Sequence, residues 1–296
     1  MLSRRSLLIT GSLAAVKLAL PSYSQAQPTR RLSNLPAAFE KIERDNNCRL
    51  GVAILDTGSG EHAGHRTEER FPMCSTFKLL LAAAVLQRVD TAREHLDRNI
   101  AVPAKPLIFN SPLTEEHAGS EMTVSALCNA ILTRSDNTAA NLLLATLGGP
   151  DGITRFARSI GDDITRLDRT ETSLNESRRG DPRDTTSPSA MTANLQTLLL
   201  GNVLAPTSRD QLIQWTIANE TGKTRLRAKL PANWRAGDKT GSNGETTTND
   251  IAIIWPTHQS PVLISAYLTE CPGIEEKRNG IIAEVGQTIF SSLQST

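Results

Sequence analysis

The sequence predicts a mixed α/β (α+β) fold, in which an antiparallel sheet is flanked by N- and C-terminal helices and joined to an all-α domain. Three observations predict it. Strand-like apolar runs occur near both ends of the chain, helical periodicity fills the middle, and one long polar segment shows little periodicity. We expect the active site in the cleft between the two domains.

The α/β domain is predicted to be discontinuous, formed by residues 30–66 and 220–296. An apolar run before a Gly- and Ser-rich turn predicts a buried strand, and two apolar runs around a short loop predict a hairpin. Apolar residues at helical spacing predict a helix at each end. In chain order these are Leu35, Phe39 and Ile42 (helix), Leu50 to Leu55 (strand), Ile251 to Trp255 with Val262 to Leu268 (hairpin), and Ile281 to Leu293 (helix).

The all-α domain is predicted over residues 67–219. Val124 to Leu132 carries apolar residues at helical spacing, and so does Ile153 to Ile160. Gly148-Gly149 separates these helices. Residues 166–188 are rich in charge, Ser, Thr and Pro, which predicts a long loop, and loops of that length are usually functional or disordered.

Residues 1–26 have the composition of a cleavable export signal. Arg4 and Arg5 resemble the twin-arginine motif, although a general secretory signal also fits. A membrane anchor is the alternative, but about 14 apolar-biased residues interrupted by Lys17 are short for a bilayer span. We expect an exported, periplasmic protein without stable membrane insertion after signal cleavage.

Composition argues against nucleic acid as a partner. The chain has 32 basic and 31 acidic residues and 4% aromatic residues, so it offers no excess charge for phosphates and few rings for base stacking. No cofactor or metal is expected, because the sequence has no Cys-x-x-Cys and no Cys/His ligand cluster. His62 and His65 are interpreted as surface residues of a hairpin.

Ser75-Thr76-Phe77-Lys78 precedes an apolar run, which predicts that Ser75 and Lys78 share a face on the first turn of a helix. A partly buried lysine beside a serine can accept or relay its proton and so activate it as a nucleophile. The alternative is a capped helix with a solvated lysine.

Two further motifs carry polar groups suited to a cleft. Ser135-Asp136-Asn137 falls between two helical stripes, and Lys239-Thr240-Gly241-Ser242 follows the strand-like residues Trp234 to Asp238. A lysine and a threonine at a strand end can bind a substrate carboxylate, and glycine allows close approach of the backbone. Taken singly, each motif is explained better by an ordinary structural feature, respectively an Asx-capped helix and a hairpin turn.

Together, and in this order, the three motifs resemble those of class A serine β-lactamases, from about residue 30 to the end of the chain. The resemblance includes the surroundings of the motifs, Phe71 to Lys78, Asn137 to Asn141 and Asn249 to Trp255. It implies a monomeric hydrolase of penicillins and cephalosporins that confers antibiotic resistance.

Arg169-Thr-Glu171-Thr-Ser-Leu-Asn175, within the long loop, resembles the family's Arg-x-Glu-x-x-Leu-Asn pattern. The resemblance implies that Glu171 and Asn175 hold the water that hydrolyses an acyl-enzyme on Ser75. It also implies an ion pair between Arg169 and Asp184 that closes the loop, and a supporting role for Asn141.

The same resemblance assigns the other site residues. The backbone N–H groups of Ser75 and Ser242 form the oxyanion hole, and Ser135 passes a proton to the leaving nitrogen. The acylation base is left open between Lys78 and Glu171. The implied substrate-binding residues are Asn137, Lys239, Thr240, Gly241, Ser242 and Arg225.

The chain departs from the family at several places. Thr248 stands where many relatives have an arginine, for which Arg225 is the available substitute, and Asn110 stands where relatives often have an aromatic residue. Cys74 lacks the partner that carbapenemases supply, because Asn243 occupies that place, and Cys128 lacks its usual helix partner. We interpret Cys74 as a packed thiol. The sequence alone does not pair Cys48, Cys74, Cys128 and Cys271.

Two rival functions share the nucleophile. A DD-peptidase or transpeptidase has the serine and lysine motifs without the loop glutamate, so it stays acylated by β-lactams. A β-lactam sensor is acylated once and signals, normally from a transmembrane tether. Glu171 distinguishes hydrolysis from the transpeptidase reaction, and the sequence after residue 26 shows no segment that would be expected to tether a sensor.

Overall fold

The computed structural model describes residues 31–294, so the predicted signal at 1–26 lies outside the described residues. The helices are α1 (Leu35–Asn46), α2 (Phe77–Asp90), α3 (Pro112–Glu116), α4 (Val124–Thr133), α5 (Asn137–Thr146), α6 (Asp151–Ser159), α7 (Pro188–Leu199), α8 (Pro206–Ile217) and α9 (Glu275–Gln294), with 3-10 turns at Cys74–Thr76, Ser173–Asn175 and Leu226–Lys229. The strands are β1 (Arg49–Asp56), β2 (His62–His65), β3 (Phe71–Pro72), β4 (Asn99–Ala101), β5 (Glu121–Thr123), β6 (Thr185–Thr186), β7 (Arg235–Ser242), β8 (Thr248–Trp255) and β9 (Val262–Thr269).

The main sheet has five strands in the order β2-β1-β9-β8-β7, and every neighbouring pair is antiparallel. The first strand of the chain therefore lies beside its last, with Leu50 opposite Leu268. The remaining strands form two short pairs, β3 with β6 and β4 with β5. The antiparallel sheet and its terminal helices confirm the predicted fold class.

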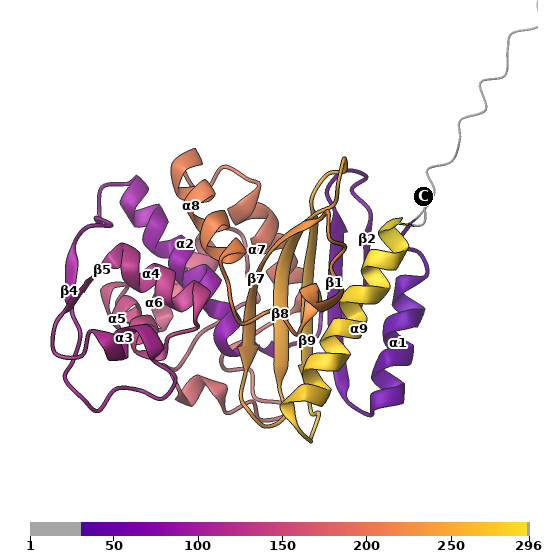
Figure 1. The fold of residues 1–296 in the computed structure, drawn as a ribbon, viewed down its shortest axis with the longest axis horizontal. Helices are drawn as coiled ribbons and strands as arrows, with labels where there is room; N and C mark the ends of the chain where they lie inside the picture. The colour runs from indigo at the N-terminus through magenta and orange to yellow at the C-terminus, as the bar shows by residue number, and fades with distance from the viewer. Residues whose placement is uncertain (1–30, 295–296) are drawn as a thin grey trace, which may run out of the picture. The chain divides into compact units, whose positions relative to one another are not determined.

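Successive side chains of each strand point to opposite faces of the sheet, and both faces are apolar. Ala252 and Ile254 of β8 belong to a core with α1 and α9, whereas Ile251 and Ile253 belong to a core with the central helices. Figure 1 shows α1 and α9 on one side of the sheet and helices α2 to α8 on the other. The division into domains at residues 66 and 220 stays a prediction. The core on the side of the central helices contains residues of the sheet as well as of these helices, so it crosses both predicted boundaries.

Helix α2 lies at the centre of the helical layer. Its residues from Phe77 to Leu86 are all buried, as expected for a helix that is apolar around its whole circumference. One of these residues is Lys78, whose side chain is fully buried. An ammonium group at such a position needs hydrogen-bonding partners, so it marks the place to look for chemistry.

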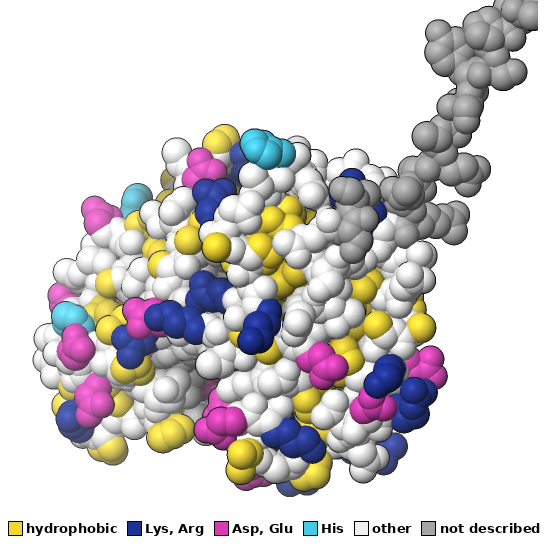
Figure 2. Space-filling model, turned by 45° about the vertical axis from the view of Figure 1, so that its right-hand side comes forward, with side chains coloured by type: hydrophobic (Ala, Val, Ile, Leu, Met, Phe, Trp, Pro, Cys, Tyr) yellow, Lys and Arg dark blue, Asp and Glu magenta, His cyan; other side chains and the backbone are white. Residues whose placement is uncertain are grey.

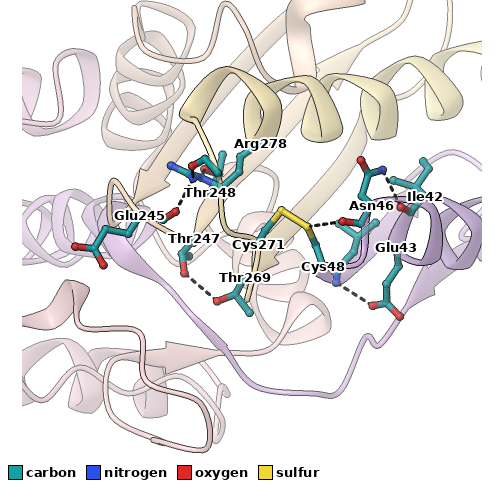
Figure 3. The surroundings of a disulfide bond; sticks show 12 residues. Ile42, Glu43, Asn46, Cys48, Glu245, Thr247, Thr248, Thr269, Cys271 and Arg278 are labelled. Carbon is teal, nitrogen blue, oxygen red and sulfur yellow. Dashed lines mark hydrogen bonds between the residues drawn. A yellow bond between two sulfur atoms is a disulfide. The ribbon is translucent and has the colours of Figure 1, made fainter.

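A disulfide joins Cys48, between α1 and β1, to Cys271, between β9 and α9. Figure 3 shows this bond near Glu245 and Arg278, which belong to the β7–β8 loop and to α9. Cys271 N–H also donates to the carbonyl of Thr246, at 3.1 Å. The pairing that the sequence left open is thus Cys48 with Cys271, while Cys74 and Cys128 are buried free thiols.

The surface agrees with the balanced charge of the sequence. Figure 2 shows a face on which basic and acidic side chains lie interspersed, with apolar side chains scattered among them. Among residues 31–294, no helix is both long and apolar enough to cross a membrane.

Candidate active site

Ser75 lies in the 3-10 turn Cys74–Thr76, which leads into α2. The sequence predicted it on the first turn of the helix itself, which is wrong by two residues because α2 begins at Phe77. Ser75 is 9% exposed, and its Oγ donates a hydrogen bond to Glu171 Oε1 at 3.2 Å. The hydroxyl is therefore both accessible from the pocket and in contact with a carboxylate.

Lys78 contacts three of the predicted site residues. Its Nζ donates to Ser135 O at 2.8 Å and to Asn137 Oδ1 at 2.6 Å, and it lies 3.0 Å from Glu171 Oε1. Burial lowers the pKa of the Lys78 ammonium below its ordinary value, although the Glu171 carboxylate opposes this shift. The alternative of a solvated lysine is excluded.

Ser135 and Asp136 lie in the loop between α4 and α5, as predicted, whereas Asn137 is the first residue of α5. Ser135 has a positive φ of 58°, and its Oγ lies 3.4 Å from Lys78 Nζ and 3.2 Å from Lys239 Nζ. Two lysines therefore face one hydroxyl.

Asp136 fixes this loop as the cap of α5, which the sequence offered only as an alternative explanation of the motif. Its fully buried carboxylate accepts hydrogen bonds from the N–H groups of Ala139, Leu113 and Thr114, at 2.9 to 3.0 Å. It thereby caps α5 and ties it to α3.

Lys239 to Ser242 form the second half of β7, not the residues after a strand. The predicted strand Trp234 to Asp238 is too short because Gly241 and Ser242 still pair with Asn249 and Thr248 of β8. A Cβ on Gly241 would lie 2.7 Å from Met73 O and 3.2 Å from Ser75 N. Glycine thus lets β7 approach the turn that carries Ser75.

Lys239 is also fully buried. Its Nζ donates to Ser135 Oγ at 3.2 Å and to Thr240 O at 2.8 Å. Burial, together with the nearby charge of Lys78, lowers the pKa of Lys239 to about 7. The charge of this lysine therefore changes near neutral pH.

Glu171 is 5% exposed and is held at both its backbone and its side chain. Asn141 clamps the backbone, donating to Glu171 O at 2.9 Å and accepting from Glu171 N at 3.0 Å. Asn175 Nδ2 donates to Glu171 Oε2 at 2.7 Å, while Asn175 Oδ1 is buried without a partner among the described residues. The carboxylate is thus fixed between Ser75 and Asn175.

Arg169 and Asp184 form the expected ion pair across the 166–188 loop. Arg169 Nε lies 2.6 Å from Asp184 Oδ2, and the second oxygen of Asp184 accepts from Asp168 N at 2.7 Å and Arg169 N at 2.9 Å. Asp184 is 1% exposed. One buried carboxylate therefore joins the two ends of the loop.

These groups border an open pocket of about 900 Å³. Lys78, Glu171 and Lys239 are buried next to it, in contact with residues that line it. The predicted site residues among its lining are Ser75, Ser135, Asn137, Arg169, Asn175, Arg225, Thr240, Gly241 and Ser242.

Arg225 lines the pocket but is 5% exposed. Its guanidinium donates to the carbonyls of Gly241 and Asn249, both at 2.9 Å, and to Asn279 Oδ1 at 2.8 Å. Burial lowers the pKa of Arg225. The structure brings this residue to the pocket wall, and its contact with a substrate carboxylate stays a prediction.

The β7–β8 loop, residues 243–247, forms another part of the pocket wall. Asn243 Oδ1 accepts from the N–H groups of Glu245, Thr246 and Thr247, at 2.9 to 3.0 Å. From α9, the fully buried Arg278 donates to the carbonyls of Gly244 at 2.8 Å and Glu245 at 2.5 Å. Arg278 also donates to Thr248 Oγ1, at 3.2 Å, so Thr248 supports this loop.

Cys74 is fully buried beside Ser75 in the chain, with its Sγ 3.7 Å from Ser177 Oγ. Burial raises the pKa of the Cys74 thiol to about 12. This agrees with its interpretation as a packed thiol. In the part of the chain that the structure describes, no cluster of three metal-ligating side chains occurs, and His62 and His65 lie on β2.

Comparison with known proteins identifies the class to which this fold and site belong. The model of the β-lactamase enzyme family matches residues 34–293. Among curated proteins, β-lactamase L2 of Stenotrophomonas maltophilia is 47% identical over 292 residues, covering 96% of each chain. β-Lactamase CTX-M-8 of Citrobacter amalonaticus is 41% identical over 286 residues, covering 97% of this chain and 96% of its own.

Solved structures agree. A class A β-lactamase representing the last common ancestor of Gram-negative bacteria has a TM-score of 0.86 and 55% identity, with 88% of this chain and all of that chain (100%) covered. A β-lactamase from Xanthomonas campestris pv. campestris has a TM-score of 0.86 and 49% identity, covering 88% and 97%. The chain belongs to the β-lactamase enzyme family, and within it to class A. It is a hydrolase of β-lactams and an antibiotic-resistance protein.

Proposed function

We propose that the enzyme hydrolyses penicillins and cephalosporins through an acyl-enzyme on Ser75, which a water activated by Glu171 then releases. The observation that carries the proposal is the position of Glu171. One carboxylate oxygen contacts both Ser75 Oγ (3.2 Å) and Lys78 Nζ (3.0 Å), and the other contacts Asn175 Nδ2 (2.7 Å).

Acylation begins with loss of the Ser75 proton as its Oγ attacks the β-lactam carbonyl. In this arrangement Ser75 donates directly to Glu171, whereas Lys78 donates to Ser135 and Asn137. These contacts favour Glu171 as the proton acceptor, with Lys78 stabilising its negative charge. The backbone N–H groups of Ser75 and Ser242 stabilise the oxyanion.

Opening of the ring requires a proton on the leaving nitrogen. Ser135 Oγ supplies it, because that hydroxyl faces the pocket and contacts both lysines, Lys78 at 3.4 Å and Lys239 at 3.2 Å. A lysine can return a proton to Ser135, so the hydroxyl is restored after each turnover.

Deacylation uses a water held between Glu171 and Asn175. Asn175 Oδ1 is a buried acceptor without a partner among the described residues, so it can bind a water hydrogen beside Glu171 Oε2. Glu171 then removes the other proton of the water as it attacks the ester carbonyl. General base catalysis of this kind contributes about 10²–10⁴-fold to a rate.

The remaining predicted residues orient the substrate. Lys239, Thr240, Ser242 and Arg225 bind its carboxylate, and Asn137 binds the amide of its side chain. We also propose that the protein works as a periplasmic monomer, exported through a signal in residues 1–26, and that 30–66 with 220–296 and 67–219 are its two domains.

The test is turnover of a chromogenic cephalosporin by the purified protein. Continuous hydrolysis supports the proposal, whereas a single burst equal to the amount of enzyme would favour a transpeptidase or a sensor. Mass spectrometry of Glu171→Ala during the reaction should show the acyl-enzyme on Ser75, because deacylation loses its base, whereas acylation keeps Lys78, the other candidate base. Rapid release by that variant would refute the role of Glu171.

Asp163→Ala is the matched control for this substitution. Asp163 is an exposed acid just before the same loop, so its removal should leave turnover unchanged and no acyl-enzyme accumulated.

A further inference from the structure

Phe109 is the most exposed of the large hydrophobic side chains among residues 31–294, at 87%. The others are Ile274 at 68% and Leu200 at 38%. A single exposed apolar side chain is ordinary on a protein surface, but Phe109 differs from the other two because it lines the active-site pocket. Its apolar ring is therefore exposed to water in the pocket, and a ligand that covers the ring would gain binding free energy.

The backbone that carries this ring is fixed to the catalytic loop. Phe109 O accepts a hydrogen bond from Asn137 Nδ2 at 2.8 Å, and Asn110 O accepts from Asn137 N at 3.0 Å. Asn110 has a φ of 59°, and its side chain donates to Ser135 O at 3.2 Å. The amide at position 110 is thus used to hold the loop, while the aromatic side chain before it stays free.

Phe109, like Asn110, also lines a second hollow of about 730 Å³, so the two hollows meet at these residues. Apolar side chains contribute to the wall of this hollow. They are Pro106, Leu107, Ile108 and Pro112. A group that extends past Phe109 from the active-site pocket therefore meets the ring first and then a hollow lined by both apolar and polar side chains.

We propose that Phe109 determines specificity by contacting an aromatic or other apolar substituent on the side chain of the β-lactam. The inference rests on the proposed function, in which Asn137 binds the amide of that side chain. Because Asn137 Nδ2 is hydrogen-bonded to the carbonyl of Phe109, a substituent just beyond the substrate amide comes next to this residue. Asn110, at the place where relatives often have an aromatic residue, does not supply such a ring.

The experiment compares two substrates that share one nucleus, benzylpenicillin and 6-aminopenicillanic acid, which lacks the acyl side chain. Phe109→Ala should raise the KM for benzylpenicillin relative to that for 6-aminopenicillanic acid by about tenfold, the effect of losing one apolar contact. Phe109→Leu, which keeps an apolar side chain, should raise this ratio of KM values less than Phe109→Ala does. Ile274→Ala, which removes another exposed apolar side chain outside the pocket, should leave the ratio unchanged.

A second measurement separates this inference from the catalytic mechanism. In a Ser75→Ala background, calorimetric titration measures binding of both compounds without acylation, and Phe109→Ala should weaken only benzylpenicillin binding. An equal effect on both compounds, or no effect on either, would overturn the role of Phe109. A selective loss of binding supports it even if acylation by the wild-type enzyme follows another route.

Discussion

Two loops border the active-site pocket and are held in different ways. In the 166–188 loop, the Asp184 carboxylate pairs with Arg169 and accepts backbone N–H groups at the other end of the loop. The 243–247 loop is held mainly through its backbone, by Asn243 and by the Arg278 guanidinium. The first loop carries the Glu171 carboxylate, so it must place one side chain accurately, whereas the second provides a surface.

Because the 166–188 loop is held by an ion pair, removing a charged side chain should affect it more than the 243–247 loop. Asp184→Ala leaves Arg169 without its buried partner, which should cost about 3 kcal/mol of folding free energy. A displacement of Glu171 by about 1 Å should lower kcat about 100-fold. Steady-state kinetics and thermal unfolding measure both effects.

The control for this prediction is Asp181→Ala in the same loop, because Asp181 pairs with the neighbouring Arg183 rather than across the loop. It should change kcat by less than about threefold. If Asp184→Ala keeps wild-type kcat, the ion pair does not position Glu171.

Substitutions that disturb the 243–247 loop should change KM rather than kcat. Arg278→Met removes the hydrogen bonds to Gly244 and Glu245, so the pocket wall loosens and KM should rise about tenfold. Arg278 contacts neither Ser75 nor Glu171, so kcat should change by less than about threefold. Arg44→Met, which removes an exposed arginine on α1, is the control. A fall in kcat at constant KM would contradict this assignment.

Because Lys239 lies on β7, kcat/KM should also depend on pH. The pKa of Lys239 is about 7, so its ammonium is charged below that pH and neutral above it. Attraction for a substrate carboxylate is therefore lost as the pH rises, and kcat/KM should fall about fivefold between pH 6 and 8. In Lys239→Arg the charge persists, so that fall should disappear. A profile of the wild type that is flat over this range would refute the prediction.

The smallest effect on turnover is expected from the disulfide. Replacing both Cys48 and Cys271 by Ser should lower stability by about 2–5 kcal/mol. The pair reaches the 243–247 loop through a backbone hydrogen bond of Cys271, which serine retains, so kinetics should change by less than about twofold. Cys128→Ala, which removes a buried free thiol, is the control for thermal unfolding. A larger kinetic effect would show that the disulfide positions the second loop.

The sequence predicted those parts of the site that depend on residue type and order. Ser75, Lys78, Ser135 and Glu171 meet as expected, and Asp184 pairs with Arg169. These residues make short-range polar contacts, and alternating or helical patterns predicted the elements around them. The strand end at Asp238 was wrong because Gly241 weakens a strand pattern even where the backbone still pairs.

Other features depend on contacts between distant segments, which a single sequence does not show. The pairing of Cys48 with Cys271 joins residues 223 positions apart. Phe109 is exposed next to Asn110, which has a positive φ that the residue type permits but does not require. Likewise, the burial of Arg225 depends on acceptors from β7, β8 and α9.

The disulfide also has a topological consequence. All the proposed catalytic and binding residues, from Ser75 to Ser242, lie between Cys48 and Cys271, so they belong to one covalently closed ring of the chain. A protease that cuts the 166–188 loop would open this ring without releasing a fragment. The two pieces, one carrying the nucleophile and the other β7, would stay joined until a reductant separates them.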